Sequence, residues 1–452
     1  MKKFWLFAGE WNNDNQALVP EFWAQEGLMY LTDEIGAARL TYWDFNPQVA
    51  EYGDTVNYWK PNKFNMRRKS DATDFIDQDA RSNKQSVKLD RWGHVTFRIG
   101  DGELAKGLPS LVKTHLVPAI RAMAMGVETT VLNMKWRFLA NLVGNLGADF
   151  SFTTGRQVIA QMRNLKWPRG DRYAFLTPTA ESAYLGIDQF TKTNYIGEDG
   201  TRLREGSLGR SLGVNWLTSE GLADIPDSYE VTVGALTANV AKGATTVIAD
   251  GFDDPLVVGS WFTVAGEMIP HRITATSQSS GNTSITFTPA LNAAVLNNAV
   301  VTVTTPTAFD GAAALDEMEL IDMDTTGSVL TEGQLVSHGS DYYGVMAATT
   351  ETKLMLDALL KTAAANGDVI GVGPAGGYSF AFHPMAMALV HRPLPKPTAG
   401  ANSAVITDPD LGLSLRSTIT YDGKSGKHRF TLDFLYGIDI MYQELGIPIL
   451  HK

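Results

Sequence analysis

The sequence predicts an α+β fold with a small antiparallel β-barrel or sandwich inserted in it. Residues 103–136 carry a long apolar stripe at helical spacing. Residues 229–304 change to short Thr- and Val-rich runs punctuated by Gly, Asn, Asp and Pro, which is typical of a small barrel or sandwich. The chain then ends in "LSLRSTITYDGKSGKHRFTLDFLYGIDIMYQEL", a pattern that predicts a hairpin of long strands.

Length and composition indicate a protein of several domains. At 452 residues the chain is too long for one core and predicts two to four domains. It contains no Cys, which excludes disulfides, Cys-based metal sites and thiol nucleophiles. The first apolar run is too short for a signal peptide and ends at Glu10, and no run approaches the roughly 18 apolar residues of a membrane span. We therefore expect a soluble protein that is intracellular when it is made.

The net charge of −11 is distributed unevenly. Residues 1–59 hold nine acidic and three basic side chains, whereas residues 60–91 hold nine basic and five acidic ones. Residues 309–376 hold eleven acidic side chains and two Lys. An acidic chain with one basic segment is not typical of a nucleic-acid reader. Opposite charges on separate segments suit contacts between subunits, and a solvated surface of uneven charge is the alternative for residues 60–91.

The N-terminal region predicts one helix. Pro20 and the residues after it form an amphipathic pattern with proline in the first turn. Its apolar face comprises Phe22, Trp23, Leu28, Leu31 and Ile35.

A long β-ribbon is predicted next. "YGDTVNYWKP" reads as a turn and a strand that ends at Pro61, and residues 62–86 are polar and aperiodic. "VKLDRWGHVTFRIG" predicts the second strand, with Val95, Phe97 and Ile99 on one face. A compact domain seldom carries so long a connection unless the connection has a function.

The stripe from Glu103 predicts a helix of about 30 residues, roughly 45 Å long. Pro109 is expected near its first turn or between it and a short leading helix, and Pro118 is expected to kink or divide it. The Met-rich stripe is interpreted as core. Its members are Leu104, Leu108, Leu111, Leu116, Ile120, Met123, Val127, Val131 and Met134.

From Thr153 the pattern alternates between helix and strand. "GRQVIAQMRNLKWP" predicts a helix, "DRYAFLTP" a short buried strand, and "TAESAYLG" a second helix with Thr179 as its N-cap. The glycines at 206, 209 and 213 lack the Lys-Ser/Thr pair of a phosphate-binding loop and are interpreted as tight turns.

The acidic residues 309–376 predict a small α+β appendage. The segment "ETKLMLDALLKTAAAN" is expected to be helical. Its apolar residues at helical spacing are Met355, Leu356, Leu359 and Leu360.

Catalytic and metal-binding motifs are not found. His383 and His391 are too far apart to share one helical turn as ligands. Asp322, Asp324 and Gly327 copy the start of a calcium loop, but Gly333 stands where that loop needs a bidentate Glu. The sequence therefore predicts no enzymatic activity, no cofactor and no metal site.

Six segments, in order, resemble the major capsid proteins of tailed double-stranded DNA bacteriophages that carry an inserted β-barrel. "YGDTVNYWKP" is similar to the entry of their extended loop, and "DGELAKG…LVPAIRAMAMGVETTVL" to their spine helix. "LREGSLGRSLGVNWLTSEGL" resembles their axial domain, and "VGSWFTVAGEMIPHRIT" a strand of the inserted barrel, with Ser260 where the family commonly has Asp. "YSFAFHPMAMALVHRPLPKP" and the final strands resemble the closing segments. Residues 309–375 resemble no part of the family.

The resemblance implies the Hong Kong type of phage capsid fold, with no catalytic role. The implied parts are an N-terminal arm (1–50), extended loop (51–101), spine helix of the peripheral domain (102–145), axial domain (146–228), inserted barrel (229–308), acidic appendage (309–376), axial return (377–397) and C-terminal strands of the peripheral domain (398–452).

The resemblance also implies a function in assembly. Hexamers and pentamers of the chain would form an icosahedral shell in the virion, after synthesis in the host cytoplasm. The implied partners are other copies of the chain, scaffolding, portal and decoration proteins, and packaged DNA bound without sequence recognition; no membrane is implied. A nanocompartment shell protein of the encapsulin kind and a host-surface-binding β protein are the alternatives. The basic residues expected at subunit contacts are Lys60, Lys63, Arg67, Arg68, Lys69, Arg81, Lys84 and Lys88.

Overall fold

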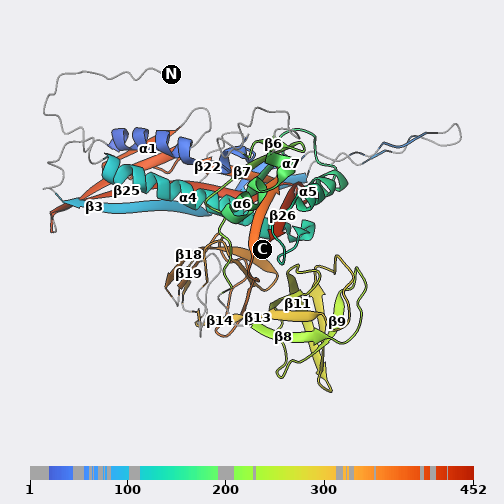
Figure 1. Ribbon diagram of the computed structural model, residues 1–452. Coiled ribbons are helices and arrows are strands. Elements are labelled where there is room, and N and C mark those ends of the chain that lie inside the picture. Colours follow the sequence, from blue (N-terminus) through green and yellow to red (C-terminus); the bar gives the residue numbers. More distant parts are fainter. Residues whose placement is uncertain are drawn as a thin grey trace.

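The computed structural model shows a mixed α+β molecule built mostly from β-sheets (Figure 1). The residues that it describes are 20–43, 55–60, 64, 66–69, 75, 77–78, 83–100, 112–191, 208–227, 231–311, 319–321, 323–324, 330–350, 353–397, 402–407, 414–424 and 426–452.

One long helical run crosses the molecule. A π-helical turn (Val112–Leu116) leads into α4 (Val117–Asn133), which continues as the 3-10 helix η4 (Met134–Asn141). The long helix is thus confirmed from residue 112 onward; its predicted start lies outside the described residues. Pro118 does not divide the run, because it lies in the first turn of α4, where a missing N–H costs little.

A five-stranded antiparallel sheet packs against this run. It consists of β22 (Met387–Arg392), β25 (Lys427–Ile440), β24 (Ser414–Asp422), β23 (Asn402–Thr407) and β3 (Arg91–Gly100), which pairs with β25. The predicted face of β3 is confirmed, because Ile99 is buried and Val95 and Phe97 pack against the same core.

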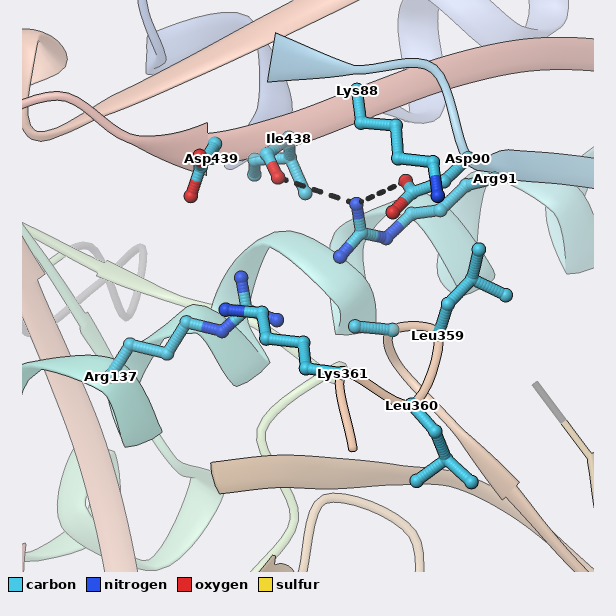
Figure 2. Close-up of a pocket in the computed structure, with 10 residues that line it drawn as sticks. Lys88, Asp90, Arg91, Arg137, Leu359, Leu360, Lys361, Ile438 and Asp439 are labelled. Atoms are coloured by element: carbon cyan, nitrogen blue, oxygen red, sulfur yellow. Dashed lines mark hydrogen bonds and ion pairs between the residues drawn. The ribbon is translucent and has the colours of Figure 1, made fainter. Parts of the chain in front are cut away.

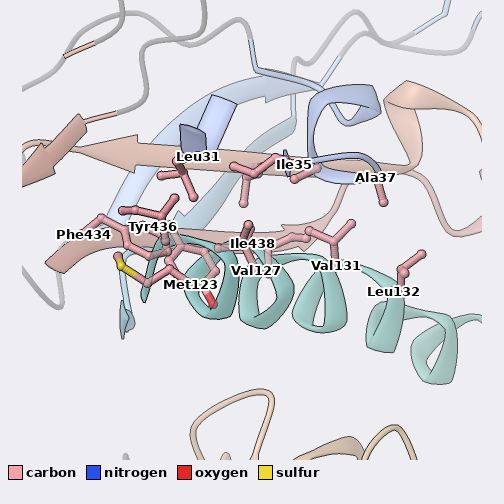
Figure 3. Close-up of a cluster of buried hydrophobic side chains, with 14 of the residues drawn as sticks. Leu31, Ile35, Ala37, Met123, Val127, Val131, Leu132, Phe434, Tyr436 and Ile438 are labelled. Atoms are coloured by element: carbon pink, nitrogen blue, oxygen red, sulfur yellow. The ribbon is translucent and has the colours of Figure 1, made fainter. Parts of the chain in front are cut away.

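Helix α1 (Pro20–Glu34) contributes Leu31 to this core, and Ile35 follows directly after it. Figure 3 shows these side chains above Val127 and Val131 of α4, with strand β25 beside them. Met123 and Met134 are 5% and 0% exposed, so the methionine stripe is core, as predicted.

A second sheet of six strands carries the remaining helices. Its order is β4 (Val143–Gly144), β26 (Gly446–His451), β21 (Gly377–Phe382), β5 (Tyr173–Leu176), β7 (Val214–Thr218) and β6 (Arg210–Ser211). The helices that follow in the chain are α5 (Phe152–Asn164), α6 (Pro178–Leu185) and α7 (Asp188–Thr191).

The predicted N-cap of α6 was wrong by two residues. The Oγ1 of Thr177 accepts the N–H of Ala180, whereas the hydroxyl of Thr179 donates to Asp224. Gly213 adopts φ +84° between β6 and β7, which supports the tight-turn interpretation there.

The barrel predicted for residues 229–304 is a closed six-stranded structure. Its strands pair in the order β10-β11-β12-β9-β8-β13 and enclose a core that includes Phe262, Ile273 and Val301. Their bounds are β8 (Val231–Leu236), β9 (Thr246–Asp250), β10 (Trp261–Val264), β11 (His271–Ser279), β12 (Asn282–Thr288) and β13 (Val300–Thr304).

The helix predicted within residues 309–376 was wrong. Met355 and Leu356 belong to a strand, and Leu359 and Leu360 follow it as buried, non-helical residues. The described strands of this segment are β14 (Thr307–Phe309), β15 (Glu319–Ile321), β16 (Met323–Asp324), β17 (Leu335–His338), β18 (Asp341–Thr350), β19 (Lys353–Leu356) and β20 (Val369–Val372).

These strands repeat the topology of the barrel. They pair in the order β15-β19-β18-β17-β20-β14-β16. Five of these strands occupy the positions of five barrel strands: β14 corresponds to β8, β17 to β10, β18 to β11, β19 to β12 and β20 to β13. The two edge strands β15 and β16 follow each other in the chain with one residue between them, and together they take the place of β9. We call residues 229–304 the first barrel and residues 307–372 the second barrel.

The two barrels also share their register. Phe262 pairs with Val303 in the first barrel, and Val336 pairs with Val372 in the second. The N–H of Gly259 donates to Ile273 in the first, as the N–H of Gly333 donates to Val345 in the second (2.9 and 2.8 Å). Both glycines have positive φ. The acidic segment therefore repeats the strand order and register of the barrel, but in the described residues its sheet is open between β15 and β16, where β9 closes the first barrel.

The first barrel packs directly on the second. The indole Nε1 of Trp261 donates to Ser337 (2.9 Å), and the hydroxyl of Thr304 donates to the carbonyl of Val372 (2.6 Å). Gly371 allows this approach, since a Cβ there would lie 2.1 Å from the Gly259 carbonyl oxygen. In Figure 1 both barrels lie on the same side of the layer formed by α4 and β25.

Candidate subunit-contact site

The segment expected to contact other subunits begins and ends in a two-stranded antiparallel ribbon. β1 (Thr55–Lys60) pairs with β2 (Asn83–Lys88) over their whole length. The second predicted strand, Val87 to Gly100, is in fact interrupted at Leu89 and Asp90. Only its first two residues belong to the ribbon; the remainder is β3, which pairs with β25.

The root of the ribbon is anchored in the protein core. Val56, Val87 and Leu89 are at most 2% exposed and pack in one cluster with residues of β22 and β25. Gly437 admits the backbone of β2, because a Cβ there would lie 2.2 Å from the carbonyl oxygen of Lys88. The ribbon therefore leaves the molecule in a fixed direction.

The basic residues expected at contacts are distributed along this segment. Arg67, Arg68 and Lys69 are exposed beyond the strands. Lys60 and Lys84 belong to β1 and β2, whereas Lys88 is half-buried at the root. Lys63 and Arg81 lie outside the described residues.

Apolar side chains in the same segment were not singled out from the sequence. Phe64, Met66 and Phe75 are 61%, 89% and 81% exposed. The Nζ of Lys69 lies 4.7 Å from the centre of the Phe75 ring. Aromatic residues, Met and Arg are the types enriched at protein interfaces. The sequence did contain a signal for them. They are large apolar residues in a stretch without helical or strand periodicity, so no local element can bury them.

A basic pocket of about 330 Å³ lies at the root of the ribbon. Figure 2 shows Lys88 and Arg91 on one side of it and Arg137 and Lys361 on the other. Near this pocket, burial raises the pKa of Asp357, against the opposing effect of Arg137 and Arg91. These residues are far apart in sequence, so no motif indicated the pocket.

Buried polar groups elsewhere serve packing. Ser379 and His451 form a hydrogen bond of 3.0 Å, as a serine nucleophile and its base would, but they are 0% and 1% exposed. A substrate could not reach them. Burial lowers the pKa of Lys135 to about 7, and it lowers the pKa of His391, which stacks on Trp43, to about 3.

Two further observations concern the described residues only. No group of three or more His, Asp or Glu side chains among them could hold a metal ion. None of their helices is both long enough and apolar enough to cross a bilayer.

Comparison with known proteins gave similarity in structure only. No protein-family model matches the chain, and no curated protein matches it. The chain is similar to the capsid structure of the cyanophage P-SCSP1u, with 9% identity over 91% of this chain and 86% of that chain and a TM-score of 0.41. It is also similar to the mature capsid of bacteriophage PhiM1, with 8% identity over 92% and 87% and a TM-score of 0.40. The capsid structure of Staphylococcus phage Andhra aligns with 9% identity over 100% and 89%, with a TM-score of 0.37. These neighbours come from phage capsids, the class that the sequence motifs resemble.

Proposed function

We propose that this chain is the major capsid protein of a tailed double-stranded DNA phage, of the Hong Kong type with an inserted barrel. It assembles through hexamers and pentamers into the icosahedral shell that encloses the genome, and it has no enzymatic role. The observation that carries this proposal is the ribbon, which has a buried root and an exposed basic and apolar end.

The ribbon is built for contact with another protein. Its root lies in the core of its own subunit, whereas Phe64, Met66 and Phe75 remain largely exposed. Large apolar side chains exposed together mark an interaction site. The same contact repeated around a closed ring gives a symmetric oligomer.

The domain assignment follows the sequence boundaries, with one change. Residues 1–50 are the N-terminal arm, 51–101 the extended loop, 102–145 the spine helix, 146–228 and 377–397 the axial domain, 229–308 the inserted barrel and 398–452 the C-terminal strands of the peripheral domain. Residues 309–376 are assigned as a second barrel instead of an α+β appendage, because they repeat the strand order of the first.

Partners are proposed from the same assignment. The chain contacts copies of itself, together with scaffolding, portal and decoration proteins, and its inner face lies against packaged DNA without reading the sequence. The acidic second barrel would lie on the outer face, because negative charge next to phosphates is electrostatically unfavourable.

The experiment that tests assembly reverses the charge at the exposed end of the ribbon. We expect the triple variant Arg67→Glu, Arg68→Glu and Lys69→Glu to be folded and soluble but to form few shells in electron micrographs. The matched control keeps the charge at the same positions, with Arg67→Lys, Arg68→Lys and Lys69→Arg, and should assemble. Normal shells from the reversed variant would refute a contact role for these residues. Absence of shells from the unmodified protein would count against the capsid assignment.

A further inference from the structure

The basic pocket at the ribbon root has features of a built binding site. It lies between four separate parts of the chain: the β2–β3 corner, η4, the loop at residues 358–361, and the end of β25. Each part contributes at least one polar or charged group, and the enclosed volume is about 330 Å³.

Arg91 is fixed by its protein partners and still has donor capacity. Its side chain is 3% exposed. The Nε donates to the carbonyl of Asp357 (2.8 Å), and Nη1 donates to the carboxylate of Asp90 (3.0 Å) and the carbonyl of Ile438 (3.3 Å). Figure 2 shows the second terminal nitrogen, Nη2, directed toward the pocket, and no described residue accepts a hydrogen bond from it.

Two further cations line the pocket without a direct ion pair, although Arg137 acts electrostatically on the buried Asp357 behind it. Within the described part of the chain, the side chains of Arg137 and Lys361 form no hydrogen bond and no ion pair of 4 Å or less with a carboxylate. Each of the two carboxylates that line the pocket accepts one hydrogen bond from the protein. Asp90 pairs with Arg91, and the Oδ1 of Asp439 accepts the backbone N–H of Ile440 (2.8 Å). Like charges at one cavity repel each other unless an anion joins them.

We propose that this pocket binds one oxyanion, a phosphate or carboxylate group, held by Arg91 Nη2, Arg137 and Lys361. The planar guanidinium of arginine matches the spacing of oxyanion oxygens, and Lys361 adds a charged donor. Asp90 and the two carbonyls orient Arg91, as outer partners do in binding sites that are organised before the ligand arrives. The group comes either from free phosphate or from an acidic side chain of a neighbouring copy of the chain.

The test measures thermal unfolding of the unassembled chain while inorganic phosphate replaces chloride at constant ionic strength. A ligand that binds only the folded state raises the unfolding midpoint with concentration. We expect a rise of several degrees for the wild-type protein, and a clearly smaller rise for Arg137→Gln/Lys361→Gln. The residual rise reports the general stabilising effect of phosphate as a salt. Lys427→Gln/Arg429→Gln, the same change of charge at exposed positions of β25, should respond like wild type.

Each outcome bears on the proposal. An equal rise in wild type and in Arg137→Gln/Lys361→Gln would overturn it. Lys361→Gln alone, at an exposed position, provides the comparison if the double variant fails to fold. The same titration on assembled particles separates the two sources. A retained response indicates free phosphate, whereas a lost response indicates that a neighbour's carboxylate fills the pocket. The phosphate titration of the unassembled chain tests the pocket independently of whether the chain forms shells.

Discussion

The contact between the two barrels allows a sharp test by a single methyl group. In Gly371→Ala, the new Cβ would lie 2.1 Å from the Gly259 carbonyl oxygen and 2.6 Å from the Ser337 hydroxyl oxygen. Neither neighbour is the end of a long, flexible side chain. The barrels must therefore move apart by about 1 Å to restore an ordinary contact distance.

The expected cost follows from the groups at this contact. Overpacking a close contact typically costs about 1–3 kcal/mol. Separation also lengthens the hydrogen bond from buried Trp261 to Ser337, and a buried donor left without its partner costs about 1–3 kcal/mol. A partial shift of the barrels relieves the overpacking but weakens the hydrogen bond, so the two costs do not add in full. We expect the free energy of unfolding to fall by about 2–4 kcal/mol.

The assay is urea unfolding of the unassembled protein, followed by tryptophan fluorescence. Gly126→Ala is the matched control, because a Cβ there meets nothing within 4 Å and the residue lies in α4. Alanine should stabilise a helix by about 0.5–1 kcal/mol relative to glycine. The same substitution should thus act in opposite directions at the two sites. A Gly371→Ala variant as stable as wild type would show that the barrels are not held at this contact.

Two further predictions concern acid stability and the placement of the second barrel. Burial lowers the pKa of His271 to about 4 and of His391 to about 3, against 6.5 in the unfolded chain. As the pH falls below 6.5, these two His side chains therefore take up protons in the unfolded state but not in the folded state. Each should lower the free energy of unfolding by up to about 1.4 kcal/mol per pH unit until its folded pKa is reached. Urea midpoints measured from pH 7.5 to 4.5 should show this decline, with a shallower slope in His391→Phe; an unchanged slope would contradict the assignment. If the second barrel faces outward, brief protease treatment of intact particles should cut within residues 309–376 before α4, whereas cleavage only after disruption would place it inside.

Hydrophobic periodicity in the sequence predicted the main helices and strands well where it was uninterrupted. The stripe of α4 and the strand β5 were predicted from their own apolar patterns, although their cores join residues far apart in sequence. The barrel was predicted because its core is formed by residues close in sequence. The helix around Leu356 was wrong because apolar residues at spacing three and four also fit a strand followed by a buried loop. Tertiary pairing with β18 decided between them.

The repeated barrel could not be read from residue identities. The matched positions conserve burial and register more than residue type: Phe262 corresponds to Val336, and Ile273 to Val345, and all four are at most 1% exposed. Only the pattern of strand pairing makes the repeat visible.

The candidate site was partly predictable. The charge of residues 60–91 located the exposed group Arg67–Lys69, because a charged stretch without an apolar period has no reason to be buried. The basic pocket was beyond sequence reasoning, since Arg91 reaches the carbonyls of Asp357 and Ile438 only after several domains have packed together.

The two barrels differ in how far each depends on its surroundings. The second barrel shares its core with η4 through Trp136 and Leu139. A substitution inside that core therefore also alters the packing of the helical run. The first barrel encloses a core of its own, and only a few of its residues, such as Trp261 and Ile269, belong to the core of the second barrel. Mutations inside the core of the first barrel should therefore disturb the rest of the chain less than mutations inside the core of the second barrel. The repeat thus combines one copy whose core is tied to the helical run with another whose core is largely its own.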